Sequence, residues 1–185
     1  KDKEERNTLS PGTDQTFPRL RAMRQSLIGT TDRRYDVALA SLVKLIVKTY
    51  WSATYLDVPP ILMAGESFGA WITCMHQIIT MDIPAEGQNA PGVEKAERKN
   101  DPWWKAKKWS LHIANRMFSR YGNPKLCKPA YKDFAAAFKN DCAGAFLQSY
   151  VRLLSTLPSG GYLPDRVVNL AVQYLTTALA SAHQA

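Results

Sequence analysis

Asp101-Pro-Trp-Trp-Lys-Ala-Lys-Lys-Trp-Ser-Leu-His-Ile-Ala-Asn-Arg-Met-Phe-Ser-Arg-Tyr-Gly-Asn-Pro124 is the stretch that decides the fold. Asp101 is a favourable N-cap, and Pro102 suits the first helical position because its missing N–H would have had no partner there. Gly122 and the proline two residues later are typical signals for the end of a helix. The stretch therefore predicts one complete helix over about residues 103–120.

Two sides of this predicted helix differ in chemistry. One side is apolar at helical spacing and consists of Trp104, Leu111, Ala114, Phe118 and Tyr121. Another side carries a basic stripe, which consists of Lys105, Lys108, His112, Arg116 and Arg120. Because residues three and four apart share a face, we expect this helix to pack on one side and to present positive charge on the other.

The composition describes one domain with a sizeable core and an excess of positive charge. The chain has 185 residues, 45% of them hydrophobic, and a formal net charge of +8. This charge favours acidic partners: nucleic acid, an anionic membrane surface or an acidic protein face. The three cysteines form no C-x-x-C pair, which argues against a disulfide framework or a zinc site and favours a reducing compartment.

The ends and the hydropathy of the chain add three expectations. No apolar run approaches the roughly twenty residues of a membrane helix, so we expect no membrane insertion. The charged start has no signal-peptide pattern behind it, which favours a soluble, intracellular protein. The sequence begins without Met, and residues 1–6 resemble the end of a helix, so we interpret the chain as a fragment of a longer protein.

Helical periodicity continues along the rest of the chain, and only a polar loop at 82–101 interrupts it at length. The predicted helices form three pairs, at about 14–54, 62–120 and 129–182. Antiparallel helix pairs in series are typical of an all-α, HEAT-type α-solenoid, which is the predicted fold of residues 1–185. The pairs share negligible sequence identity, so a compact irregular bundle stays open as an alternative.

A G-x-S-x-G motif at Gly65–Gly69 raises the alternative of a serine hydrolase. Ser67 would be the nucleophile, and Asp165 and His183 follow in the required order. However, a nucleophile elbow needs β-strands before it, and the preceding segments have helical periodicity. His183 also lies close to the end of the chain, where a rigidly held base is not expected. We therefore predict no catalytic residues.

Other kinds of site have weaker signals. The basic stripe could neutralise phosphates, so a helical nucleic-acid-binding module is the main alternative function. The alternative without a ligand is that the stripe is an ordinary solvated helix face. Trp103, Trp104 and Trp109 have the spacing of packing residues. His76 and His112 lack companion ligands for a metal, and no Gly-rich phosphate loop is present, so we predict neither a metal nor a cofactor.

Residues 101–124 also closely resemble a block of the importin-β superfamily, in the branch of importins seven and eight. That block has the pattern Pro-x-Trp-Trp-Lys-x-Lys-Lys-Trp-Ala-Leu-His-Ile, followed by Arg-x-Phe-x-Arg-Tyr-Gly. The Tyr50-Trp51 helix and the segment from Leu163 to Val167 are similar to the same family. The resemblance covers nearly the whole chain, which would be about a fifth of a full receptor.

The resemblance implies a segment from the N-terminal to middle HEAT repeats of a nuclear transport receptor. Such receptors shuttle between cytoplasm and nucleus, carry basic cargo such as ribosomal proteins or histones, bind the GTP-bound form of the GTPase Ran and pass FG-repeat nucleoporins; direct nucleic-acid binding is not expected. The first helix of each pair would face outward and the second inward. Nucleoporin contacts would fall on the outer helices, at Phe68, Ile72, Met75, Phe134 and Phe138, whose alternative interpretation is inter-repeat core. The positive charge departs from the acidic character of such receptors.

Overall fold

A computed structural model describes residues 33–83, 98–158 and 160–183. Every regular element in these residues is helical, which confirms the predicted all-α fold. The main helices are α2 (Arg33–Ala53), α4 (Gly65–Thr80), α6 (Pro102–Tyr121), α8 (Gly144–Leu154) and α9 (Asp165–His183). Shorter elements are α3 (Pro60–Met63), η3 (Pro124–Leu126), η4 (Pro129–Tyr131), α7 (Lys132–Ala137) and the π-helix η5 (Phe138–Ala143).

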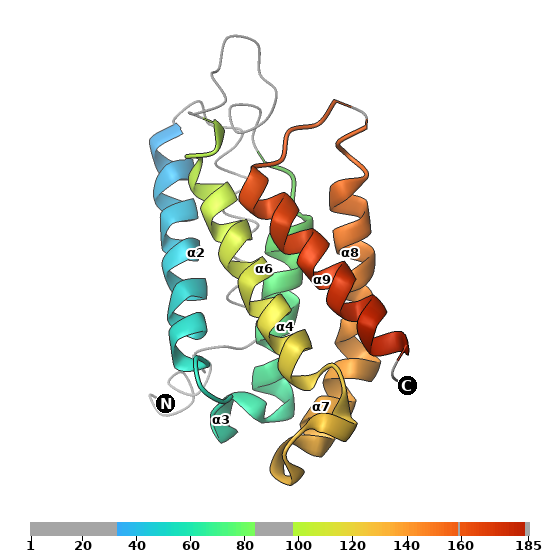
Figure 1. Ribbon diagram of the computed structural model, residues 1–185. Coiled ribbons are helices and arrows are strands. Elements are labelled where there is room, and N and C mark those ends of the chain that lie inside the picture. Colours follow the sequence, from blue (N-terminus) through green and yellow to red (C-terminus); the bar gives the residue numbers. More distant parts are fainter. Residues whose placement is uncertain (1–32, 84–97, 159, 184–185) are drawn as a thin grey trace, which may run out of the picture.

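The helices form two layers. The layer in front in Figure 1 contains α2, α6 and α9, and α4 and α8 lie behind it. Trp103, at the start of α6, bonds to Asp36 near the start of α2, and Arg116 further along α6 bonds to Trp51 near the end of α2. Trp104 meets Tyr162 just before α9, and Phe118 meets Tyr174 further along it, so the three front helices run in the same direction (Figure 1). The helices α4 and α8 run the opposite way, which gives the antiparallel pairs α4–α6 and α8–α9. This arrangement is that of a HEAT-type solenoid.

The first predicted pair is only half described. Its second helix is α2, whereas the predicted helix at 14–29 lies outside the described residues, as do residues 84–97 of the predicted polar loop. The division of the chain into three pairs therefore stays a prediction.

The helix α6 begins and ends where the sequence indicates. The Asp101 carboxylate accepts a hydrogen bond from the backbone N–H of Trp103 at 2.8 Å, and Pro102 occupies the first turn. At the other end Gly122 donates to the Phe118 carbonyl, and a side chain at Gly122 would meet this same oxygen at 2.5 Å. Glycine is therefore required there by close approach of the backbone.

Two predicted helices differ from the expected continuous form. The helix expected from Pro60 to about Met81 is broken at Ala64, whose ψ of 133° is extended and separates α3 from α4. The segment from Tyr131 to Leu154 stays helical but contains the π-helix η5, and there the Tyr174 hydroxyl donates to the Ala143 carbonyl at 3.1 Å. The change of helix type ends directly before Gly144, the first residue of α8.

Aromatic side chains fill the space between the layers. Tyr150 and Tyr174 join α8 to α9 with ring centroids 4.3 Å apart, and Phe118 joins α6 to Tyr174 at 4.8 Å. Tyr50 and Trp71 meet across α2 and α4 at 4.5 Å. These rings belong to one continuous core, as the apolar face of α6 predicts.

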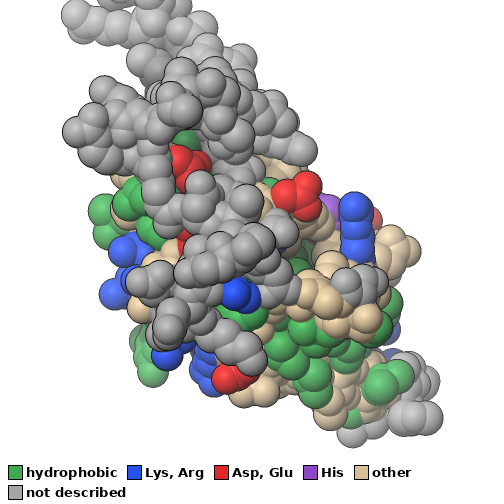
Figure 2. Space-filling view, turned by 90° about the horizontal axis from the view of Figure 1, so that it is seen from above, with side chains coloured by type: hydrophobic (Ala, Val, Ile, Leu, Met, Phe, Trp, Pro, Cys, Tyr) green, Lys and Arg blue, Asp and Glu red, His purple; other side chains and the backbone are tan. Residues whose placement is uncertain are grey.

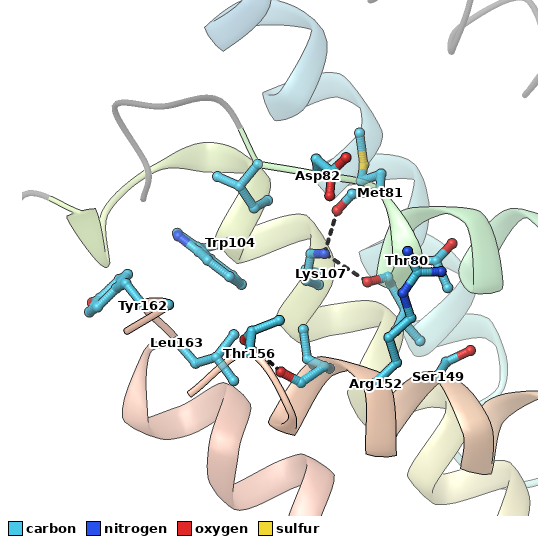
Figure 3. A pocket seen from close by; sticks show the side chains of 14 residues that line it. Thr80, Met81, Asp82, Trp104, Lys107, Ser149, Arg152, Thr156, Tyr162 and Leu163 are labelled. Carbon is cyan, nitrogen blue, oxygen red and sulfur yellow. Dashed lines mark hydrogen bonds between the residues drawn. The ribbon is translucent and has the colours of Figure 1, made fainter. Parts of the chain in front are cut away.

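A buried lysine ties the two helices of the second pair together. Lys107 is only 3% exposed, and its ammonium group donates to the carbonyls of Ile79 and Met81, each at 2.7 Å. Figure 3 shows Lys107 reaching from α6 to the C-terminal end of α4, beside a pocket of about 190 Å³. A cation at this end of a helix satisfies carbonyls that have no intrahelical donor and complements the helix dipole.

Replacing Lys107 by methionine should lower the free energy of unfolding by about 2–3 kcal/mol, because two buried carbonyls lose a charged donor. Urea unfolding followed by circular dichroism measures this change. The matched control is Lys105→Met, at an exposed position of the same helix, which should stay within about 0.5 kcal/mol of the original protein. Equal effects of the two substitutions would contradict a clamping role for Lys107.

Candidate functional site

The basic stripe lies on the side of α6 between its neighbours α2 and α9, in the front layer. Lys105 is exposed, and the other four members, Lys108, His112, Arg116 and Arg120, are half-buried. The common face expected from helical spacing is therefore present. The residues at its two ends, however, have different surroundings and make different contacts.

The C-terminal end of the stripe is bonded to α2. The Arg116 guanidinium donates to the carbonyls of Trp51 at 2.9 Å and Thr54 at 3.2 Å, and lies over the Trp51 ring. Arg120 donates to the carbonyls of Thr54, Tyr55 and Leu56. These carbonyls lie at and just beyond the end of α2, where they lack intrahelical donors. Arg116 and Arg120 therefore bind α2 and are not freely available to a partner.

The N-terminal end of the stripe meets cations from two other helices. Lys48 of α2 and Lys108 of α6 hold their ammonium groups 5.6 and 5.5 Å from the Trp109 ring centroid. The pKa of Lys108 is lowered, first by burial and then by Arg166, Lys105 and Lys48. We call Lys48, Lys105, Lys108 and Arg166 the cationic patch.

No carboxylate among the described residues neutralises the cationic patch. None of its four residues forms an ion pair within the part of the chain that the structure describes. Seen from above, several Lys and Arg side chains gather on one half of the visible surface, and hydrophobic side chains cover much of the other half (Figure 2). An uncompensated group of cations of this kind raises the local concentration of anionic ligands.

His112 lies at the centre of the stripe between two tryptophans. Its ring centroid is 5.5 Å from both Trp51 and Trp109. Burial, then the charges of Arg166, Lys108 and Arg116, lower the pKa of His112 to about 4. His112 is therefore neutral at physiological pH and serves as an aromatic spacer between α2 and α6 rather than as a cation.

Lys48 and Arg166 also belong to the charged surface, although the sequence of α6 does not indicate them. Both are far from residues 101–124 in the sequence and are brought there by packing of α2 and α9 against α6. Lys44 and Lys48 are four residues apart on α2, which is the local signal that could have indicated a basic side of that helix. No local signal relates Arg166 to Lys108.

The five residues expected to contact nucleoporins lie between α4 and the α7–η5 segment. Phe68, Ile72, Met75 and Phe138 are buried, and Phe134 is half-buried. The ring centroids of Phe68 and Phe134 are 4.5 Å apart, and those of Phe68 and Phe138 are 6.4 Å apart. The three phenylalanines thus pack together between α4 and the α7–η5 segment, and Ile72 and Met75 belong to the buried core. Contact of the five residues with nucleoporins stays a prediction.

The G-x-S-x-G motif opens a helix instead of forming a nucleophile elbow. Ser67 lies in the first turn of α4, directly after the one-turn helix α3, and no strand precedes it in the described residues. Asp165 and His183 are the first and last residues of α9, about 27 Å apart along the helix axis at 1.5 Å per residue. These residues therefore do not form a catalytic triad.

A second serine and histidine do meet, but not in a catalytic arrangement. Ser149 Oγ lies 2.8 Å from His76 Nε2 and also donates to the Ala145 carbonyl at 2.8 Å. A hydroxyl has one hydrogen, so when Ser149 donates it to the Ala145 carbonyl, His76 carries its proton on Nε2 and donates to Ser149. In that tautomer His76 cannot act as a base toward the serine. Burial lowers the pKa of His76, in agreement with a neutral ring.

No group of three or more His, Cys, Asp or Glu side chains in the described residues could hold a metal ion. None of the helices in this part of the chain combines the length and apolar character that crossing a bilayer requires. Cys74, Cys127 and Cys142 are free thiols.

Replacing Arg116 by glutamine should lower the free energy of unfolding by about 1–2 kcal/mol, because the carbonyls at the end of α2 lose a charged donor. Urea denaturation is the measurement. Lys108→Gln removes the same charge from a patch residue without described hydrogen bonds and should change stability by no more than about 0.5 kcal/mol. If both variants lose the same stability, the loss reflects net charge and not the bonds to α2.

The pKa of His112 can be measured directly by NMR titration, and we expect about 4. Since an unfolded histidine titrates near 6.5, the unfolded chain binds the proton more readily, and stability should fall as pH drops from about 6.5 toward 4. Arg166→Gln should raise the pKa of His112, because it removes the leading repulsive charge. His76 is the internal control and should not respond; titration of His112 near 6.5 would contradict its described environment.

The chain is similar to segments of several much longer proteins. An importin β-like SAD2 homolog from Arabidopsis thaliana is 37% identical over 182 residues, which are 98% of this chain and 17% of that protein. Human Importin-8 is 29% identical over 172 residues, 93% of this chain and 16% of that protein. Nonsense-mediated mRNA decay protein 5 of Saccharomyces cerevisiae is 34% identical over 111 residues, 60% of this chain and 10% of that protein.

These relatives confirm the predicted resemblance to the importin-β superfamily over nearly the whole chain. The chain spans less than a fifth of the length of each of them. No protein-family model matches the sequence, and no solved structure matches it.

Proposed function

Because the chain is homologous to one segment of importin-β superfamily proteins over nearly its whole length, we propose that it forms part of a nuclear transport receptor. The observation that carries the proposal is this homology along a two-layer array of antiparallel helices. In such an array each pair contacts only its neighbours, and the outer surfaces of the layers bind other proteins over a large area. The proposed role is binding, without catalysis.

The receptor as a whole would carry protein cargo and release it on binding the GTP-bound form of Ran. Stacked helix pairs support this mechanism physically, because small rotations at each joint add up to a change of superhelical pitch. A ligand that prefers one curvature then disfavours a ligand that prefers another, and binding of Ran displaces cargo. Shuttling between cytoplasm and nucleus follows from this role.

The sign of the charge argues that this segment is not where basic cargo is held. The front layer presents the cationic patch, and like charges facing each other across an interface oppose binding. We therefore assign ribosomal proteins, histones and similar cargo to other parts of the receptor. FG-repeat nucleoporins would use the region of Phe68 and Phe134, where the latter ring is half-buried.

The alternative of a nucleic-acid-binding module has less support than the sequence indicated. Two of the five stripe residues, Arg116 and Arg120, donate to backbone carbonyls of α2 and its following turn. His112 is neutral at physiological pH, since its pKa is lowered to about 4. Only Lys105 and Lys108 of the stripe are thus available to phosphates, and affinity for a nucleic-acid backbone depends on many such cations.

A chimera tests the proposal. The homologous segment of human Importin-8 is replaced by this chain, and nuclear entry of the labelled receptor is measured in permeabilised cells supplied with Ran and GTP. We expect the chimera to accumulate in nuclei and to release cargo when GTP-bound Ran is added. The control is the same receptor with the segment deleted, which should lose accumulation because the superhelix is interrupted. A folded chimera that behaves like the deletion would overturn the proposal.

A further inference from the structure

A groove with a volume of about 790 Å³ runs between the first turns of α6 and the segment that leads into α9. Four basic side chains line it: Lys99, Lys105, Lys108 and Arg166. Its lining includes one carboxylate, that of Asp165. The described lining is therefore strongly cationic.

The same groove also offers apolar surface. Trp104 and Tyr162 meet edge to face in its lining, with ring centroids 6.1 Å apart. Leu157 lies in the turn that follows α8 and is 39% exposed, so part of its side chain reaches solvent. A groove of this composition is complementary to a ligand that combines negative charge with an apolar side chain.

The cations around the groove repel one another and have no carboxylate partner among the described residues. None of the four forms an ion pair in the described part of the chain, and three of them, Lys105, Lys108 and Arg166, belong to the cationic patch. The pKa of Lys108 is lowered by burial and by its neighbours Arg166 and Lys105, which shows how closely these charges are placed. An anionic ligand would replace repulsion by attraction at several positions at once.

We propose that this groove binds a short acidic protein segment that carries at least one aromatic or aliphatic side chain. A protein segment fits better than a nucleic acid, because the available cations surround one groove with an apolar lining and do not continue along α6. Arg116 and Arg120, which would extend the track, are bonded to α2 and its following turn. The proposal concerns binding by the chain itself and is independent of a role in nuclear transport.

Fluorescence anisotropy with the complete chain tests the groove. The probe is a fluorescein-labelled peptide of alternating Glu and Ser with one central Phe, and the control peptide has Gln in place of Glu. Lys105→Glu combined with Lys108→Glu should weaken binding of the probe at least about tenfold. Lys132→Glu combined with Lys139→Glu makes the same charge change at exposed positions of α7 and η5, outside the groove, and should change binding less than about twofold.

Arg166→Glu is a second groove variant. If the double variant loses its helical circular dichroism, binding of the probe to Arg166→Glu tests the proposal instead, and it should be weakened. Equal weakening by both lysine pairs would overturn the proposal, because net charge would then explain binding. Absence of binding by the unaltered chain, or equal binding of the Gln peptide, would also overturn it. A single-stranded oligonucleotide of matched charge that binds more tightly, and is lost with the groove variants, would assign the groove to nucleic acid instead.

Discussion

The carbonyl groups at the C-terminal ends of α2 and α4 need hydrogen-bond donors, and α6 supplies donors to both. Lys107 reaches the end of α4, while Arg116 and Arg120 reach the end of α2 and the turn that follows it. The last four carbonyls of any helix have no intrahelical donor, and burying them unpaired would cost about 1–3 kcal/mol each. One helix therefore fixes the ends of two neighbours, one in its own layer and one in the layer behind.

The type of cation matches the position that it serves. Lys107 is a compact charge that points between two carbonyls in a site that is almost closed to solvent. Arg116 instead bonds two carbonyls and stacks its flat guanidinium on Trp51, which an ammonium group cannot do with the same geometry. This use of charge places Lys107, Arg116 and Arg120 in contacts between helices. Part of the formal net charge of +8 therefore serves contacts within the chain.

Local features of the sequence predicted α6 well, because its signals are local. Asp101, Pro102 and Gly122 act within one turn of the helix ends, and the apolar residues face the core as their spacing indicates. The break at Ala64 and the π-helix before Gly144 were not predicted, since no glycine or proline occupies either position. At the π-helix a contact from another helix is present, since the Tyr174 hydroxyl of α9 donates to the Ala143 carbonyl at the end of η5.

The candidate site was predicted only as a face of one helix. Helical periodicity predicted that Lys105, Lys108, His112, Arg116 and Arg120 share one side of α6. It could not show which of these residues bond to a neighbouring helix and which can contact a ligand. That difference depends on Trp51 and Thr54, more than sixty positions away in sequence. The same limit concealed Lys48 and Arg166, because contacts between helices of different repeats leave no trace in the spacing of either helix.

The contacts between repeats also differ in how they respond to a change of curvature. The joint between α6 and α9 is partly polar: the Asn115 amide donates to the Leu170 carbonyl at 2.8 Å and accepts from the Tyr150 hydroxyl at 3.2 Å. A half-buried hydrogen bond of this kind can be exchanged for one to water at small net cost. The aromatic contacts deeper between the repeats, such as Phe118 of α6 with Tyr174 of α9, lose apolar burial if they separate. Rotation of one repeat about its aromatic core, with remaking of the polar bonds at the edge, is therefore the least costly movement available to this array.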